Sequence, residues 1–142
     1  MTESTGLDDF NEKVIREFRD NNGKVGGWFE GRTVLLLHHK GARTGTQRVN
    51  PLMYQKVADS YAIFASNGGD PADPKWYHNL LTSPDTVIEV DNEKIGVRAR
   101  VAGPDERGPI WEKQMRDMPN FAEYEKTAAP REIPVIILDP VS

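Results

Sequence analysis

The sequence predicts an α+β protein in which six mostly antiparallel strands form a barrel, with an N-terminal helix and further helices between the strands. Short apolar runs bounded by glycine, proline, Asn or Asp recur along the chain, and helical periodicity occurs at the N-terminus and in the second half. The strands are not regularly separated by helices, which disfavours a parallel Rossmann-type sheet. The 142 residues contain no repeat and no long linker, so we expect a single domain over 1–142.

The first predicted element is a helix over residues 8–21. Phe10, Val14 and Phe18 are spaced by four residues, a pattern that predicts one apolar stripe along the helix. Asn22-Gly23 follows, and this pair is typical of the residues at which a helix ends. We therefore expect the helix to pack on the rest of the protein through this stripe.

Three predicted strands follow in the first half of the chain. The first covers 33–39, and its continuous apolar run Val34–Leu37 indicates that both of its faces are covered. The second covers 49–57. A tight turn at Asp59-Ser60 then leads into the third strand, over 61–66.

The second half of the chain alternates between helices and strands. The predicted elements are a helix over 74–83, strands over 86–90 and 94–102, helices over 105–118 and 120–128, and a strand over 133–138. Asp73-Pro74 provides a cap and a proline for the first helix of this series. Asp91-Asn92 predicts a hairpin between the two strands, and Pro119 separates the last two helices.

Composition limits the possible functions. The chain has no cysteine, so disulfides, thiolate chemistry and Cys-ligated metal sites are excluded. Its formal net charge is −4 and it has no basic stripe, which disfavours nucleic-acid binding. The N-terminus is acidic and polar, and no apolar run approaches the roughly 20 residues of a membrane span. We therefore expect a cytoplasmic protein without stable membrane insertion.

The loop between the first two strands is basic although the chain is acidic. Lys40, Arg43 and Arg48 bring positive charge to it, and Gly41 and Gly45 let the backbone approach a ligand closely. Such a local concentration of positive charge indicates a site for one specific anion, a phosphate or a carboxylate. The alternative is a hairpin connection whose cations only keep it soluble.

Two further segments could meet the same ligand. Ala65–Gly69 follows a strand and offers a hydroxyl, an amide and free backbone donors. Lys75–Asn79 begins a helix, whose N-terminus attracts anions, and includes Trp76 and Tyr77 as flat apolar surfaces. Cations beside large aromatic side chains suit a ligand with an anionic tail and a planar ring. The alternative is that the two aromatic residues are core anchors of their helix.

Metal and nucleophile chemistry find little support in the sequence. His38 and His39 are adjacent in a strand, so their side chains point to opposite faces and cannot share one metal ion. His78 is the only other histidine. We predict no metal site and interpret the strand histidines as packing or pocket-lining residues. Ser66 lacks the nucleophile-elbow context of a hydrolase.

A face of three residues near Pro119 could line a substrate pocket. Met118, Phe121 and Tyr124 are spaced by three residues and could form one apolar face. The phenol of Tyr124 is the only hydrogen-bond donor on that face. The alternative is that this helix packs against the barrel.

Taken together, these segments resemble the deazaflavin-dependent nitroreductase family of actinobacteria, whose members are split β-barrels that bind coenzyme F420. The resemblance covers about residues 10–140 and implies an FMN-binding-like split barrel. It is carried by Gly26–Gly31, Gly41–Gly45, Arg48–Leu52, Ala65–Gly69, Pro74–Leu80 and Arg131–Val135. That many matches in the same order make chance similarity improbable.

The resemblance implies roles for particular residues. The coenzyme is flat and strongly anionic, and the family pattern places its phosphate and tail on the basic loop and its ring along the second strand. The implied cofactor-binding residues are Lys40, Ala42, Arg43, Thr44, Arg48, Val49, Asn50, Pro51, Leu52, Met53, Ala65, Ser66, Asn67, Lys75, Trp76, Tyr77 and Asn79. Ser66 and Tyr124 are the candidate catalytic residues, and Met118, Phe121 and Tyr124 the candidate substrate pocket.

The predicted function is transfer of a hydride from reduced coenzyme F420 to a small hydrophobic acceptor: a quinone, an enone or a nitroaromatic. One alternative is an FMN-binding split-barrel oxidoreductase, and another is a non-catalytic carrier of coenzyme F420. The nitroimidazole-activating member of the family is tyrosine-rich on its substrate side. In this sequence only Tyr124 of the three residues on that face has a phenol, since the other two are Met118 and Phe121. This argues against prodrug-type nitroreduction. A homodimer is a possible assembly.

Overall fold

The structure is a computed structural model that describes residues 6–29 and 31–141. Within these residues the helices are α1 (Gly6–Asp20), α2 (Lys75–Thr82), α3 (Pro104–Asp117), α4 (Asn120–Ala128) and the 3-10 turns η1 (Gly27–Phe29) and η2 (Asn67–Gly69). The strands are β1 (Val34–Lys40), β2 (Gln47–Met53), β3 (Gln55–Val57), β4 (Ser60–Phe64), β5 (Asp85–Val90), β6 (Glu93–Val101) and β7 (Val135–Pro140).

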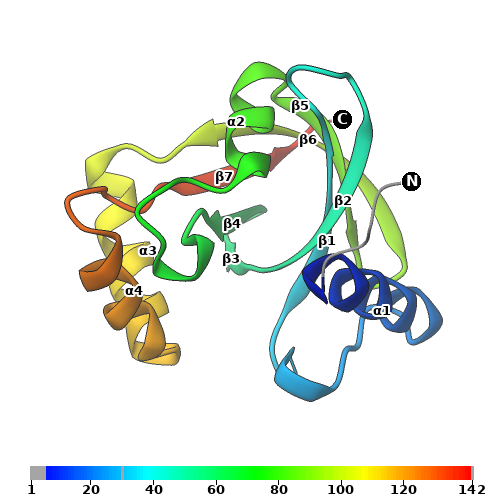
Figure 1. Cartoon of the computed structure of the whole chain (residues 1–142), viewed down its shortest axis with the longest axis horizontal. Helices are drawn as coiled ribbons and strands as arrows, with labels where there is room; N and C mark the ends of the chain where they lie inside the picture. Colours follow the sequence, from blue (N-terminus) through cyan, green and yellow to red (C-terminus); the bar gives the residue numbers. More distant parts are fainter. Residues whose placement is uncertain (1–5, 30, 142) are drawn as a thin grey trace.

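All seven described strands form one antiparallel sheet with the order β2-β1-β5-β6-β7-β4-β3. The two edge strands, β2 and β3, are consecutive in the chain, and only Tyr54 separates them. A sheet whose opposite edges are joined by one residue has to curl on itself, and Figure 1 shows the resulting half-open barrel. The predicted α+β class and antiparallel barrel are therefore confirmed.

The predicted strand count of six is wrong, because the single strand expected over 49–57 is two strands. Residues up to Met53 pair with β1, whereas Gln55 pairs with Ala62 of β4. At the break, the backbone N–H of Tyr54 donates to the carbonyl of Thr33, 3.2 Å away. The apolar pattern of the sequence continues through the break and gives no sign of it. The break arises because residues on its two sides pair with different strands.

Most other predicted elements are confirmed within a few residues. The predicted hairpin around Asp91-Asn92 is confirmed between β5 and β6, and Asp91 has a left-handed φ of 55°. The expected cap of α2 is wrong. Pro74 occupies the N-cap position without a side-chain cap, and Asp73 instead binds Arg131 at 2.8 Å.

Three apolar clusters cover the two faces of the sheet. Leu35 and Leu37 of β1 face the barrel interior, in one cluster with Trp76 of α2. Val34 and Leu36 point the other way, into a cluster with Val14 and Phe18 of α1. Phe10, the third residue of the predicted stripe, is 44% exposed and stacks on Phe29 instead. The expectation that both faces of this strand are covered is confirmed. Figure 1 shows α1 on one side of the barrel and α3 and α4 on the far side, where a further cluster lies.

Candidate functional site

The predicted anion loop connects β1 to β2 and is closed by its own backbone. The N–H of Gly41 donates to the carbonyl of Thr46 at 2.9 Å, and the N–H of Gly45 donates to the carbonyl of Gly41 at 2.8 Å. Gly45 has a φ of +71°, a conformation that favours glycine. The Thr44 hydroxyl is used inside the loop, 2.9 Å from the hydroxyl of Thr46. The loop therefore has a defined shape without a ligand.

The cations of this region are exposed and carry no ion pair to another described residue. They are Lys40, Arg43, Arg48 and Lys75. Several arginines elsewhere do form ion pairs, as with Arg98 and Asp85 at 3.0 Å or Arg100 and Glu106 at 2.6 Å. Unpaired arginines beside a structured loop leave their donors available for an external anion.

A chain of hydrogen bonds fixes the loop to the barrel through a buried histidine. Asn79 Oδ1 accepts from the backbone N–H of Ala42 at 2.9 Å, and Asn79 Nδ2 lies 2.9 Å from His39 Nδ1. On the other side of the ring, His39 Nε2 lies 2.6 Å from Asn50 Oδ1. His39 is 4% exposed and Asn79 is 7% exposed, so the chain is shielded from water. It joins β1, β2, α2 and the loop.

Burial sets the charge of this histidine. Loss of solvation lowers the pKa of His39, the Asn50 hydrogen bond opposes this with a smaller effect, and the nearby charge of Arg48 lowers the pKa further. The neutral ring fits its partners when Nε2 carries the proton. Nε2–H then donates to the Asn50 carbonyl oxygen, and Nδ1 accepts from the Asn79 amide.

The side chain of the neighbouring histidine, His38, lies on the opposite face of β1, as the sequence predicted. His38 Nε2 lies 2.6 Å from Oε2 of Glu89, a carboxylate that Arg19 of α1 also binds at 2.8 Å. Arg19 is the main cause of the lowered pKa of Glu89, which is 7% exposed. This cluster anchors α1 to the sheet and lies away from the loop. Within the described residues, no three His, Asp or Glu side chains gather closely enough to hold a metal ion.

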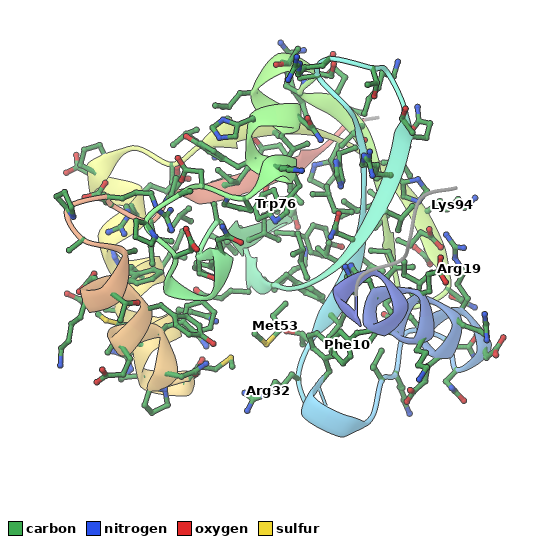
Figure 2. The ribbon with its side chains drawn as sticks, viewed as in Figure 1. Phe10, Arg19, Arg32, Met53, Trp76 and Lys94 are labelled. Atoms are coloured by element: carbon green, nitrogen blue, oxygen red, sulfur yellow. The ribbon has the colours of Figure 1, made fainter. Side chains whose placement is uncertain are left out.

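Strand β2 divides the predicted ring-edging residues between its two faces. Leu52 packs against the interior cluster, and Asn50 reaches the interior-facing His39. Val49 packs against the α1 side, and Met53, labelled in Figure 2, packs both there and against the cluster under α3 and α4. Pro51 lies opposite Leu36 in register and is buried on the same side. Only Asn50 and Leu52 of this set therefore face the interior.

Lys40 is similarly separated from Arg48. In β1 the residues Leu35, Leu37 and His39 point to the interior, so alternation places Lys40 on the other face with His38. Arg48 lies opposite His39 in register, which places it on the interior side of β2.

The Ala65–Gly69 segment is held by Arg131, a residue to which the sequence gave no role. Its guanidinium donates to the carbonyls of Ala65 at 3.0 Å, Ser66 at 3.0 Å and Asp70 at 2.7 Å, and it binds Asp73 at 2.8 Å. Its side chain is 12% exposed. Arg131 thereby sets the path of the segment that carries Ser66 and Asn67. Its place in a motif of the family resemblance was the available signal.

The start of α2 combines a core anchor with an exposed cation. Trp76 is 6% exposed and packs in the interior cluster, so the core-anchor alternative describes it, and Figure 2 shows it in the middle of the molecule. Tyr77 is half-buried, and burial raises the pKa of its phenol. Lys75 lies four residues before Asn79, on the same side of the helix, and is exposed.

The three residues proposed as a substrate pocket differ in exposure. Met118 is 7% exposed and Phe121 is 3% exposed, and Phe121 packs against the rings of Phe64 and Trp111 at 5.7 and 6.0 Å. The packing alternative therefore describes these two. Tyr124 is half-buried, and its phenol oxygen accepts from Asn120 at 3.0 Å.

Tyr124 also lies beside the Ala65–Gly69 segment. A Cβ placed on Gly69 would come 3.0 Å from the Cα of Tyr124. The Thr127 hydroxyl donates to the Gly69 carbonyl at 2.8 Å, which ties α4 to this segment. The structure thus brings Tyr124 to the same edge of the barrel as Ser66 and Asn67.

Comparison with known proteins identifies the family. The profile of the F420H(2)-dependent quinone reductase family matches residues 11–140. The chain belongs to this family. A protein of Mycobacterium tuberculosis named F420H(2)-dependent quinone reductase is 36% identical over 124 residues, which cover 85% of this chain and 83% of that protein.

Solved structures agree with membership of the family of F420H(2)-dependent quinone reductases. A structure of an F420-H2 dependent reductase (FDR-A) matches with a TM-score of 0.67 and 33% identity, over 75% of this chain and 93% of that one. A second, described as a domain-swapped dimer, matches with a TM-score of 0.70 and 29% identity, over 95% and 100% of the two chains. The resemblance drawn from the sequence motifs is confirmed, and so is the split-barrel fold that it implied.

The wider neighbours share the fold alone. HutZ of Vibrio cholerae matches with a TM-score of 0.57 at 15% identity, over 92% of this chain and 90% of that one.

As a member of the F420H(2)-dependent quinone reductase family, this chain is an oxidoreductase. No described helix is both long and apolar enough to cross a membrane.

Proposed function

We propose that this protein transfers a hydride from reduced coenzyme F420 to a quinone-type acceptor. The observation that carries the proposal is that Arg43 and Arg48, at a preformed loop, have no ion-pair partner among the described residues. The hydrogen bonds around His39 hold this loop to the interior face of the barrel. Membership of the F420H(2)-dependent quinone reductase family gives the reaction class.

The anionic end of the coenzyme would be held by the exposed cations. Arg43 and Arg48 supply forked donors suited to phosphate and carboxylate groups, and Lys75 adds charge at the start of α2. A long polyanionic tail needs several such partners, and Arg43, Arg48 and Lys75 fit that need, whereas Lys40 lies on the other face of β1. The amide of Ala42 and the hydroxyl of Thr44 already have partners, so these residues contribute by shaping the loop.

The ring of the coenzyme would lie along the interior side of β2, between the loop and the Ala65–Gly69 segment. On β2, Asn50 bonds to the interior-facing His39 and Leu52 packs against the interior cluster, and these residues would edge the ring together with Ser66 and Asn67, which follow the end of β4. When bound, the reduced coenzyme supplies the hydride, so the protein has to place it and exclude water. Arg131 contributes by fixing the backbone on which Ser66 stands.

The acceptor would approach from the edge where Tyr124 and the Ala65–Gly69 segment meet. The phenol of Tyr124 is half-exposed and can donate to an acceptor oxygen that gains electron density. Met118 and Phe121 support this edge from the core behind it. A small hydrophobic quinone fits an edge that offers apolar surface and one donor.

We infer that the protein, as a member of the family of F420H(2)-dependent quinone reductases, acts in the cytoplasm. A homodimer is the assembly that we propose, because a related structure is described as a domain-swapped dimer.

An anaerobic assay tests this function. We expect reduced coenzyme F420 to be oxidised when a quinone is added, as followed by the recovery of deazaflavin absorbance. Titration with FMN in parallel tests the competing coenzyme. Binding of FMN without binding of coenzyme F420 would overturn the proposal. Binding of coenzyme F420 without turnover on any quinone, enone or nitroaromatic would show a carrier.

A further inference from the structure

The orientation of the Asn79 amide links the charge of a buried histidine to an exposed loop. The side-chain oxygen of Asn79 accepts from the Ala42 N–H, and its side-chain nitrogen donates to His39 Nδ1. Each end of the amide therefore has one hydrogen-bond partner. A backbone N–H can only donate, and an amide nitrogen can only donate. The arrangement therefore requires that His39 Nδ1 carry no proton.

The alternative states of the ring would break this arrangement. If Nδ1 carried the proton, in the other neutral tautomer or in the imidazolium, Asn79 would have to turn its oxygen toward the ring. Its nitrogen would then face the N–H of Ala42, and two donors would meet. At the far side, the carbonyl oxygen of Asn50 accepts from Nε2–H and so favours the tautomer that leaves Nδ1 free.

The surroundings of His39 also favour the neutral ring. Arg48 lies opposite it on β2, His38 adjoins it on β1, and Lys75 stands one turn before Asn79 on α2. These groups are cationic or become so on protonation, and α2 meets the ring itself with the neutral amide of Asn79. Burial of the ring acts in the same direction.

We propose that His39, as the neutral Nε2–H tautomer, is the positioning residue of the anion loop: through Asn79 it fixes the Ala42 amide and so presents Arg43 and Arg48 in one geometry. The loop needs such a support because residues 42–48 are exposed and their cations repel one another. This inference rests on the proposed function, since the anion that the loop receives is taken to be the tail of coenzyme F420.

A first experiment uses the coenzyme-free protein. The ring nitrogens of His39 are followed by ¹⁵N NMR near neutral pH, together with the hydrogen exchange of the Ala42 amide. We expect a protonated Nε2, an unprotonated Nδ1 and a protected Ala42 amide. A protonated Nδ1, or an Ala42 amide that exchanges as fast as an unprotected loop amide, would overturn the proposal whether or not the coenzyme binds.

A second experiment compares three variants. His39→Gln keeps one acceptor and one donor at the ring position, His39→Phe removes both, and His38→Phe is the matched control on the opposite face. We expect His39→Phe to lose Ala42 protection and to bind oxidised coenzyme F420 roughly tenfold more weakly, as when a loop is competent for about a tenth of the time. The loss should raise the KM for reduced coenzyme F420 more than it lowers kcat.

The outcomes separate this inference from the function on which it rests. His39→Gln should recover most of the affinity, and His38→Phe should keep both affinity and Ala42 protection. If His39→Phe binds the coenzyme as well as the wild type, or if His38→Phe weakens it equally, His39 has no positioning role. If His39→Phe does not fold, the proposal is tested by the NMR experiment on the wild type and by the coenzyme affinity of His39→Gln. Failure of the wild type to bind coenzyme F420 would instead contradict the proposed function.

Discussion

The backbone nitrogen of Ala42 and the side-chain oxygen of Asn79 lie 2.9 Å apart, although 37 residues separate them in the chain. This single hydrogen bond joins the basic loop to helix α2. The loop carries Arg43 and Arg48, and α2 carries Lys75, so the bond holds cations from two distant segments in one arrangement. A ligand with several negative charges benefits from such preorganisation, because less loop entropy is lost on binding.

Removal of a loop arginine should weaken coenzyme binding. We expect Arg43→Ala and Arg48→Ala each to cost about 1–3 kcal/mol of binding free energy, the range for hydrogen bonds to charged groups. Because both side chains are exposed, the loss should shrink as salt concentration rises. Titration of oxidised coenzyme F420 at two salt concentrations measures this. Arg98→Ala is the control, since Arg98 pairs with Asp85 on an exposed surface. Equal losses in all three variants would place the anion site elsewhere.

Replacement of Arg131 should act on the path of the Ala65–Gly69 segment. Arg131→Lys keeps the charge but cannot reach three carbonyls and the Asp73 carboxylate at once. We expect a loss of about 1–3 kcal/mol in unfolding free energy, from groups left without partners. Turnover should also fall, since Ser66 loses its fixed backbone. Thermal unfolding and quinone-dependent turnover together test this, and a variant equal to wild type in both would rule out the role.

Substitutions of Phe121 and Tyr124 on α4 should distinguish a residue that packs in the core from one that acts in the reaction. Phe121→Ala should reduce unfolding free energy by about 3–5 kcal/mol, because it leaves a cavity between Phe64 and Trp111. Tyr124→Phe should leave stability nearly unchanged, since its phenol has one partner, Asn120, at a half-exposed site. We expect Tyr124→Phe to lower the rate of quinone reduction while coenzyme affinity stays constant. If its steady-state rates match those of the wild type, Tyr124 is a packing residue like Phe121.

Much of the fold could be predicted because its signals are local. Four consecutive apolar residues, Val34–Leu37, predict a strand covered on both faces, and Asp91 marks a turn that any antiparallel pair would need. The break at Tyr54 has no such signal. It exists because β2 pairs with β1 while β3 pairs with β4, and the choice of partner strand depends on residues far away in the chain.

The segments of the candidate site could be chosen from the sequence, whereas the contacts between them could not. The basic loop and the start of α2 were expected to act together, and the Ala42–Asn79 hydrogen bond joins them. The role of His39 could not be foreseen, because its partners lie 11 and 40 residues further along the chain. Met118 and Phe121 share a spacing with Tyr124, but spacing alone does not say which side of a helix meets a core.

The pH dependence of stability should reveal the neutral state of His39. Burial lowers its pKa below the usual 6.5, so below that pH the unfolded chain takes up a proton that the folded protein does not. Stability that is present at neutral pH is therefore lost as the pH falls from 6.5 toward the folded-state pKa. Glu89 does not disturb this window, because Arg19 holds the pKa of Glu89 below 4.5, and its contribution is lost only at lower pH. Denaturant unfolding of the wild type and His39→Gln from about pH 7.5 to about pH 5 isolates the effect, since all shared groups cancel. The wild type should lose stability relative to His39→Gln as the pH falls, and parallel curves would show that His39 titrates alike in both states.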